Sequence, residues 1–76
     1  MKELVKMICK SLVDNPEDVK VTQIDGEQTS ILELRVHKSD IGQVIGKQGR
    51  TAIAIRTILS AAGMKHNRWY RLEILE

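Results

Sequence analysis

The chain has 76 residues, a net charge of +2 at pH 7 and 42% hydrophobic residues, with only two aromatic side chains, Trp69 and Tyr70. This length predicts one domain with a thin stability margin and an aliphatic core, and leaves no room for a second domain. The single cysteine, Cys9, excludes an intrachain disulfide, and no segment is long and apolar enough to span a bilayer. We therefore expect a cytoplasmic protein that does not insert into membranes.

The first half of the chain predicts one helix and a pair of strands. Apolar residues recur at three- and four-residue spacing over the start of the chain, which indicates an amphipathic helix, and Pro16 follows its end. Apolar residues then alternate with polar ones in two runs, at 19–21 and 32–36, with Asp25-Gly26 as a turn between them. These runs predict two strands paired as an antiparallel hairpin.

The second half predicts two helices separated by a pair of glycines, followed by a third strand. Ser39 is a good N-cap for a short helix that Gly46 can end. A longer helix is expected over residues 50–62, with Gly63 as its C-terminal cap. Alternation at 70–74 predicts the last strand. The order α-β-β-α-α-β predicts one two-layer α+β domain.

The charged residues are distributed unevenly along the chain. Residues 1–40 contain six basic and eight acidic residues, whereas residues 41–72 contain six basic residues and no acidic one. Such a distribution concentrates polyanions near one surface, although a solvated basic face would give the same pattern. The basic residues of the second half are Lys47, Arg50, Arg56, Lys65, Arg68 and Arg71. This basic half begins where the glycine pair lies.

The stretch Gly46-Lys47-Gln48-Gly49 interrupts the helical pattern. Each glycine costs a helix about 1 kcal/mol relative to alanine, and the pair could form only a tight corner between two helices. A corner alone does not explain the lysine inside it or the arginine that follows it. Backbone without side chains lets a phosphate approach amide groups, and the N-terminus of the next helix adds positive potential. The stretch therefore suits a phosphodiester.

The run Ile41–Arg50, IGQVIGKQGR, resembles the helix-GxxG-helix signature of KH domains, RNA-binding modules whose GxxG loop clamps the backbone of about four nucleotides. The order of the elements is similar to the type II KH arrangement. The length and the run VIGKQGRTAIAIRTILSAAG resemble the KhpA family of small stand-alone KH proteins. The resemblance implies a single KH domain over residues 1–76 with a GxxG loop at 46–49. It also implies a three-stranded mixed sheet with three helices packed on one face.

The resemblance also implies which residues bind single-stranded RNA. The implied set is Ile41, Val44, Ile45, Gly46, Lys47, Gln48, Gly49, Arg50 and Arg56. In this set the glycines allow close approach of the RNA backbone, the loop tip and the arginines contact phosphate, and the apolar residues line a groove for bases. Leu32, Leu34 or Val36 is expected near the floor of the groove and Ala52 on its apolar side, with some of these apolar residues in the core instead. The implied function is that of an RNA chaperone or post-transcriptional regulator.

Enzymatic chemistry is not expected from this sequence. The glycines of the run 42–46 leave three residues between them where a phosphate-binding P-loop needs four, and no Mg²⁺ ligand is supplied. Cys9, His37 and His66 have no recognisable catalytic partner or metal-ligand set, and they are interpreted as structural residues. Trp69 is expected to cap the core or face solvent, and it is not counted as a base-stacking residue. No cofactor is expected.

The outward face of the long helix predicts a second class of function, protein assembly. Ile55 and Leu59 lie on the core stripe of this helix, and Ile53 points almost directly away from that stripe. The uncharged residues of the outward face are Ile53, Ala54, Thr57, Ala61 and Met64, with Ile58 at its border. This face predicts a homodimer, or an assembly module in which RNA binding is secondary. The resemblance to the KhpA family implies self-pairing and a larger KH-containing partner of the Jag type.

Overall fold

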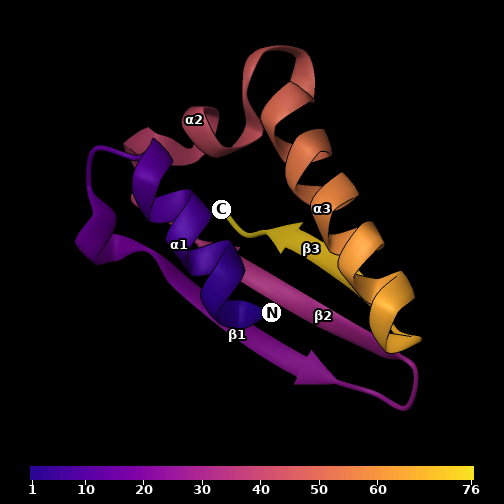
Figure 1. Cartoon of the computed structure of the whole chain (residues 1–76). Helices are drawn as coiled ribbons and strands as arrows, with labels where there is room; N and C mark the ends of the chain where they lie inside the picture. The colour runs from indigo at the N-terminus through magenta and orange to yellow at the C-terminus, as the bar shows by residue number, and fades with distance from the viewer.

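The computed structural model describes residues 1–76, and its elements follow the predicted order α-β-β-α-α-β (Figure 1). The helices and strands are α1 (Lys2–Leu12), β1 (Lys20–Asp25), β2 (Thr29–Arg35), α2 (Ile41–Ile45), α3 (Arg50–His66) and β3 (Trp69–Ile74). Short 3-10 turns occupy Pro16–Asp18, Lys38–Asp40 and Lys47–Gly49. The last of these turns separates α2 from α3, at the predicted break in the helical pattern. None of the helices combines the length and the apolar character needed to cross a membrane.

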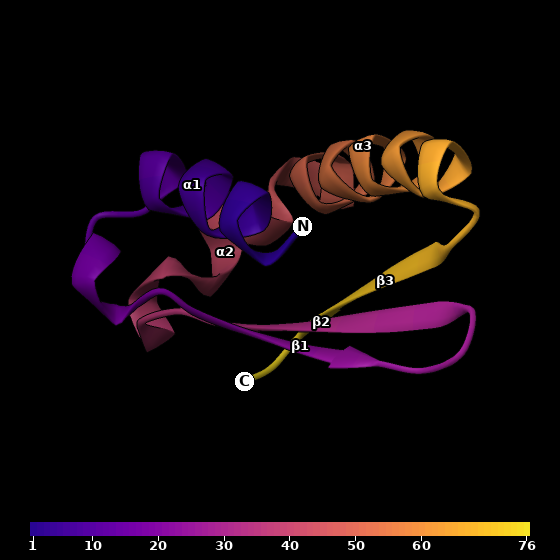
Figure 2. The same ribbon diagram turned by 60° about the horizontal axis from the view of Figure 1, so that its bottom comes forward.

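The three strands form one mixed sheet in the order β1-β2-β3. β1 pairs with β2 in the antiparallel direction, with Val21 opposite Leu34. β3 pairs with β2 in the parallel direction, with Leu72 opposite Leu32, and α2 and α3 supply the crossover that a parallel pair requires. The three helices lie on one side of the sheet (Figure 2). This arrangement confirms the expected α+β fold with a mixed sheet and helices on one face.

The core lies between the sheet and the helices and is aliphatic. Alternate residues of β2 are buried, which places Leu32 and Leu34 on the side of the sheet that faces the helices. The buried core residues are Val5, Cys9, Val19, Leu32, Leu34, Val44, Ala52, Ile55, Leu59 and Leu72. Burial raises the pKa of the Cys9 thiol to about 11, so this thiol stays protonated at neutral pH.

The predicted C-terminal end of the long helix is wrong. α3 continues past Gly63 to His66, and Asn67 ends it in the left-handed conformation, with φ 55°. Gly63 lies instead where α3 packs against the start of β3. A Cβ at Gly63 would collide with the carbonyl oxygen of Arg68, so glycine is required for close packing and not for a cap.

The predicted start of α2 also differs from the structure. Ser39 is not the N-cap, because it lies in the preceding 3-10 turn with its hydroxyl 2.8 Å from Nδ1 of His37, and α2 begins after Asp40. The buried Asp40 carboxylate accepts hydrogen bonds from the backbone amides of Asp14 (3.3 Å) and Asn15 (3.0 Å) and from the Asn15 side chain (3.0 Å). Burial acts to raise the pKa of Asp40, but these hydrogen bonds outweigh it and lower the pKa. The charged Asp40 therefore ties the chain after α1 to the start of α2.

Candidate nucleic-acid interface

The GxxG loop makes a sharp turn between α2 and α3, at the top of Figure 1. Three of its residues have positive φ: Gly46 (79°), Gln48 (57°) and Gly49 (74°). The Gly46 amide donates to the carbonyl of Gly42 at 2.8 Å, and the Gly49 amide donates to the carbonyl of Gly46 at 3.1 Å. The side chains of Lys47 and Gln48 at the tip are exposed. The loop thus presents backbone and two polar side chains beside the N-terminus of α3, where the helix dipole attracts anions.

The two glycines of the loop are required for different reasons. A Cβ at Gly46 would collide with the hydroxyl oxygen of Thr51 and lie 2.8 Å from its backbone nitrogen, so no side chain fits there. A Cβ at Gly49 would meet no atom within 4 Å, so only the positive φ favours glycine. The need for a tight corner therefore accounts for Gly46, whereas the surface over Gly49 is open to a ligand.

Sequence reasoning missed Gly42 as a candidate site residue. It lies inside α2, its φ is not positive, and a Cβ there would meet no atom within 4 Å. Neither packing nor backbone conformation requires glycine, although glycine costs a helix about 1 kcal/mol relative to alanine. Gly42 lies about one helical turn before Gly46, so it extends the side-chain-free surface of the loop along α2. The sequence signal that could have identified Gly42 is a glycine inside a predicted helix, away from either helix end, where no cap is needed.

The apolar residues predicted for the groove divide between the core and the surface. Val44 is 0% exposed and Ala52 is 3% exposed, so both belong to the core, as do the two leucines expected on the groove floor. Ile41 is half-buried, and Ile45 is 37% exposed. Only these two isoleucines of the predicted set present apolar surface beside the loop.

A cavity of about 650 Å³ lies beside the start of α2. It is lined by Arg35, Val36, Lys38, Ile41, Leu75 and Glu76. Of the three residues expected on the groove floor, Val36 is therefore the one that reaches a surface cavity. Its lining combines apolar side chains with two cationic residues and the acidic Glu76, and the cavity offers room for a base beside Ile41.

The predicted phosphate-binding cations lie in two places. Lys47 and Arg50 are exposed and lie at the loop, next to the N-terminus of α3. Arg56 lies further along α3, about 9 Å from Arg50 by helical rise, and its Nη2 donates to the carbonyl of Leu72 at 3.2 Å. Since β3 is an edge strand, Arg56 covers part of a free sheet edge. The structure thus brings Lys47 and Arg50 together and holds Arg56 against β3.

The outward face of α3 is exposed, as the helical pattern predicts. Its residues Ile53, Ala54, Thr57, Ile58 and Ala61 are all exposed. The two large apolar members, Ile53 and Ile58, are 58% and 46% exposed. This face is accessible to another protein, and its use in self-pairing stays a prediction.

The residues that could support catalysis or bind a metal are dispersed. Cys9 is completely buried as a protonated thiol. His37 shares a hydrogen bond with Ser39, and His66 is exposed in the last turn of α3. No group of three or more His, Cys, Asp and Glu side chains lies close enough together to hold a metal ion.

The fold and the loop together define a KH domain with the type II order of elements. A family model described as "KhpA/KhpB, KH domain" matches residues 2–74, and the chain belongs to this family. It is 57% identical to the RNA-binding protein KhpA of Clostridium perfringens over 75 residues, which cover 99% of this chain and 100% of that protein. It is 53% identical to the RNA-binding protein KhpA of Aquifex aeolicus, with 100% of this chain and 96% of that protein covered. No solved structure matches the chain significantly.

Proposed function

We propose that this chain acts as a single KH domain over residues 1–76 that binds single-stranded RNA through its GxxG loop. The observation that carries the proposal is the open surface over Gly49, which a ligand can approach between Lys47 and Arg50 at the N-terminus of α3. The similarity to relatives named RNA-binding protein KhpA supports the same function. We infer that the protein is not an enzyme, and that it works in the cytoplasm as an RNA chaperone or post-transcriptional regulator.

In this proposal the RNA backbone lies across the loop and the bases lie toward α2. Phosphates contact the open backbone surface over Gly49 and the side chains of Lys47, Gln48 and Arg50, and Arg56 contacts the RNA further along α3. Bases contact Ile41 and Ile45, beside the cavity at the start of α2. Val44 and Ala52 support these isoleucines from the core. No aromatic platform is needed at such a groove, because aliphatic contacts and hydrogen bonds hold the bases.

The test replaces Lys47 and Gln48 with aspartate and keeps both glycines, so that the corner survives. Circular dichroism should be unchanged, and binding to single-stranded RNA should be lost because two acidic side chains repel phosphate. A matched control, Lys10→Asp with Ser11→Asp, makes the same change in charge on the exposed end of α1 and should retain binding. RNA binding that survives the loop substitutions would refute the loop assignment.

The salt dependence of binding tests the electrostatic part of the proposal. If Lys47, Arg50 and Arg56 neutralise about three phosphates, log affinity should fall against log salt concentration with a slope of roughly −2 for a single strand. Affinity is measured by fluorescence anisotropy of a labelled oligonucleotide over a range of salt concentrations. A slope near zero would contradict phosphate binding by these cations.

A second function, self-pairing through α3, is favoured by the exposed Ile53 and Ile58. We propose that the wild-type chain forms a homodimer through this face, and that a larger Jag-type partner with a KH domain binds the chain. Ile53→Asp or Ile58→Asp should halve the mass measured by sedimentation equilibrium. Met7→Asp, which places the same charge at an exposed apolar position of α1, should leave the mass unchanged. A monomer before and after substitution would refute self-pairing.

A further inference from the structure

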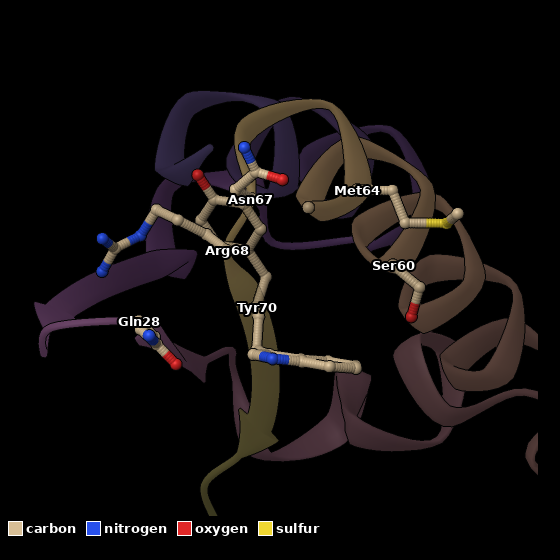
Figure 3. A pocket seen from close by; sticks show the side chains of 8 residues that line it. Gln28, Ser60, Met64, Asn67, Arg68 and Tyr70 are labelled. Atoms are coloured by element: carbon tan, nitrogen blue, oxygen red, sulfur yellow. The ribbon is translucent and has the colours of Figure 1, made fainter.

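A cavity of about 420 Å³ lies at the end of α3 that is distant from the GxxG loop, between this helix and the start of β3. Ser60 and Met64 project from α3 beside it, and Arg68 and Tyr70 come from the turn and strand that follow (Figure 3). Trp69 also lines the cavity. Both aromatic residues of the chain therefore meet at one cavity that the GxxG loop does not share.

The apolar side chains at this cavity are more exposed than packing of the core requires. Trp69 is 71% exposed and Met64 is 81% exposed, whereas Tyr70 is half-buried. An exposed indole offers a flat apolar face, and stacking of an RNA base on such a face is independent of the base sequence. Trp69, which the sequence analysis does not count as a base-stacking residue, is thus exposed enough to stack on a planar ligand. The loop region has no aromatic side chain that could do so.

The wall of the cavity around Arg68 is rigid. Its guanidinium donates four hydrogen bonds, to the carbonyls of Gly26 and Glu27 and twice to the hydroxyl of Ser30, at distances from 2.8 to 3.3 Å. The Ser30 hydroxyl donates in turn to the carboxylate of Asp25 at 2.6 Å, and this bond is the main cause of the lowered pKa of Asp25. The β1-β2 hairpin is thereby fixed to the turn after α3, which holds this wall of the cavity in place.

The polar groups at the cavity suit a base better than a phosphate. Gln28 and Asn67 supply amides and Ser60 supplies a hydroxyl, and these groups both donate and accept hydrogen bonds. The cavity lies at the C-terminal end of α3, where the helix dipole disfavours an anion. Arg71 is exposed two residues after Trp69, on the same face of β3, and can meet a phosphate outside the cavity.

We propose that this cavity is a second subsite for single-stranded RNA, in which Trp69 stacks on a base of the strand that the GxxG loop holds. The inference rests on the proposed function. Arg50 and Met64 are separated by about 21 Å along the axis of α3, and Arg56 lies between them. A strand that reaches both subsites must therefore be longer than roughly four nucleotides, the length that a GxxG loop clamps.

The test uses the intrinsic fluorescence of the protein, because Trp69 is its only tryptophan. The full chain is titrated with two pools of single-stranded RNA of randomised sequence, about four and about ten nucleotides long. We expect the longer pool to quench Trp69 and the shorter pool to leave its fluorescence unchanged. Trp69→Leu should lower affinity for the longer pool by about fivefold or more, the effect of one lost stacking contact, and leave affinity for the shorter pool unchanged.

Three control variants isolate the contribution of the Trp69 ring to RNA affinity. Trp69→Phe keeps an aromatic ring and should retain most of the affinity for the longer pool. Met7→Ala removes an exposed apolar side chain of α1 and should have no effect. Lys47→Asp with Gln48→Asp should weaken binding of both pools, which tests the GxxG loop independently of Trp69.

Two results would overturn the subsite. In the first, Trp69→Leu binds the longer pool as tightly as the wild type does. In the second, the loss of affinity in Trp69→Leu is accompanied by a change of mass in solution, which would assign the cavity to an interface between copies of the chain. Either result leaves the loop assignment standing, provided that the loop variant loses binding of both pools.

Discussion

Replacing Gly42 with alanine should make the protein more stable and a weaker binder of RNA. Gly42 lies inside α2 without positive φ, and a Cβ there would meet no atom within 4 Å, so the new methyl group causes no strain. Alanine also restricts the unfolded chain and favours the helix. The expected gain is about 0.4–1 kcal/mol in the free energy of unfolding. For a domain of this size, that gain raises Tm by about 2–8 °C.

The expected loss of RNA affinity follows from where the new methyl group lies. It lies about one helical turn before Gly46, on the face of α2 that continues into the loop. If it prevents one hydrogen bond to a phosphate, the cost of about 1.5–3 kcal/mol lowers affinity roughly tenfold or more. Thermal unfolding followed by circular dichroism measures stability, and anisotropy of a labelled oligonucleotide measures affinity.

Alanine substitutions at the two loop glycines, Gly46 and Gly49, serve as matched comparisons for Gly42→Ala. Gly49→Ala meets no neighbouring atom but must adopt a φ of 74°, which costs about 1–2 kcal/mol. Gly46→Ala has the same conformational cost, and its Cβ also collides with the side chain and backbone of Thr51. Unfolding stability should therefore fall in the order Gly42→Ala, wild type, Gly49→Ala, Gly46→Ala. A stabilised Gly42→Ala that binds RNA as tightly as the wild type would refute a role for Gly42 in binding.

Three further predictions concern residues outside the loop that stabilise the fold. Gly63→Ala should destabilise the protein by about 1–3 kcal/mol in urea unfolding, because its Cβ would collide with the carbonyl of Arg68, and an unchanged urea midpoint would contradict this packing. The pKa of Asp40 is lowered in the fold, so its contribution to stability is present above the unfolded pKa of about 4 and is lost as the pH falls through the folded value. Asp40→Asn should accordingly lower the urea midpoint at about pH 7 and have a much smaller effect near pH 2, and an equal effect at both would contradict the assignment. The folded pKa of Cys9 is about 11 against an ordinary value of 9.0, so stability should fall as the pH rises above 9.0, and Cys9 should react with thiol reagents at neutral pH only as fast as the fold opens. Rapid labelling of the native protein would contradict its burial.

Much of the fold was predictable because its signals are local. Alternation marks the strands, three- and four-residue spacing marks α1 and α3, and the glycine pair marks the break between α2 and α3. The wrong helix ends depend on contacts with distant residues. Gly63 is a residue type that often caps a helix, but here it is needed for close packing against Arg68, and Asn67 ends the helix instead. Packing between the end of a helix and the next strand produces no periodic pattern in the sequence, so it could not be predicted from it.

The candidate site was predictable only where its residues are close to the loop in sequence. Lys47 and Arg50 are tied to the loop by sequence adjacency, so their place follows once the loop is recognised. Val44 and Ile45 are neighbours on a helix of five residues, and so short a helix does not show which of the two faces the core. In the structure the Val44 side chain is 0% exposed and faces the core, whereas Ile45 is 37% exposed. Gly42 was considered only as the first glycine of an incomplete P-loop, because a glycine inside a helical pattern has no neighbour in sequence that indicates a binding role.

The two ends of α3 are fixed by contacts that leave no room for a β-carbon. Gly46 lies against Thr51 at the N-terminal end, and Gly63 lies against Arg68 at the C-terminal end. The first contact holds the loop against the first turn of α3, and the second holds the last turns of α3 against the turn that leads into β3, so the GxxG loop and the cavity beside Met64 lie at fixed places at the two ends of this helix. Gly42 lies outside both contacts. A substitution at Gly42 can therefore change RNA binding while the packing at both ends of α3 stays intact. A substitution at Gly46 or Gly63 disturbs that packing, so its effect on RNA binding cannot be separated from its effect on stability.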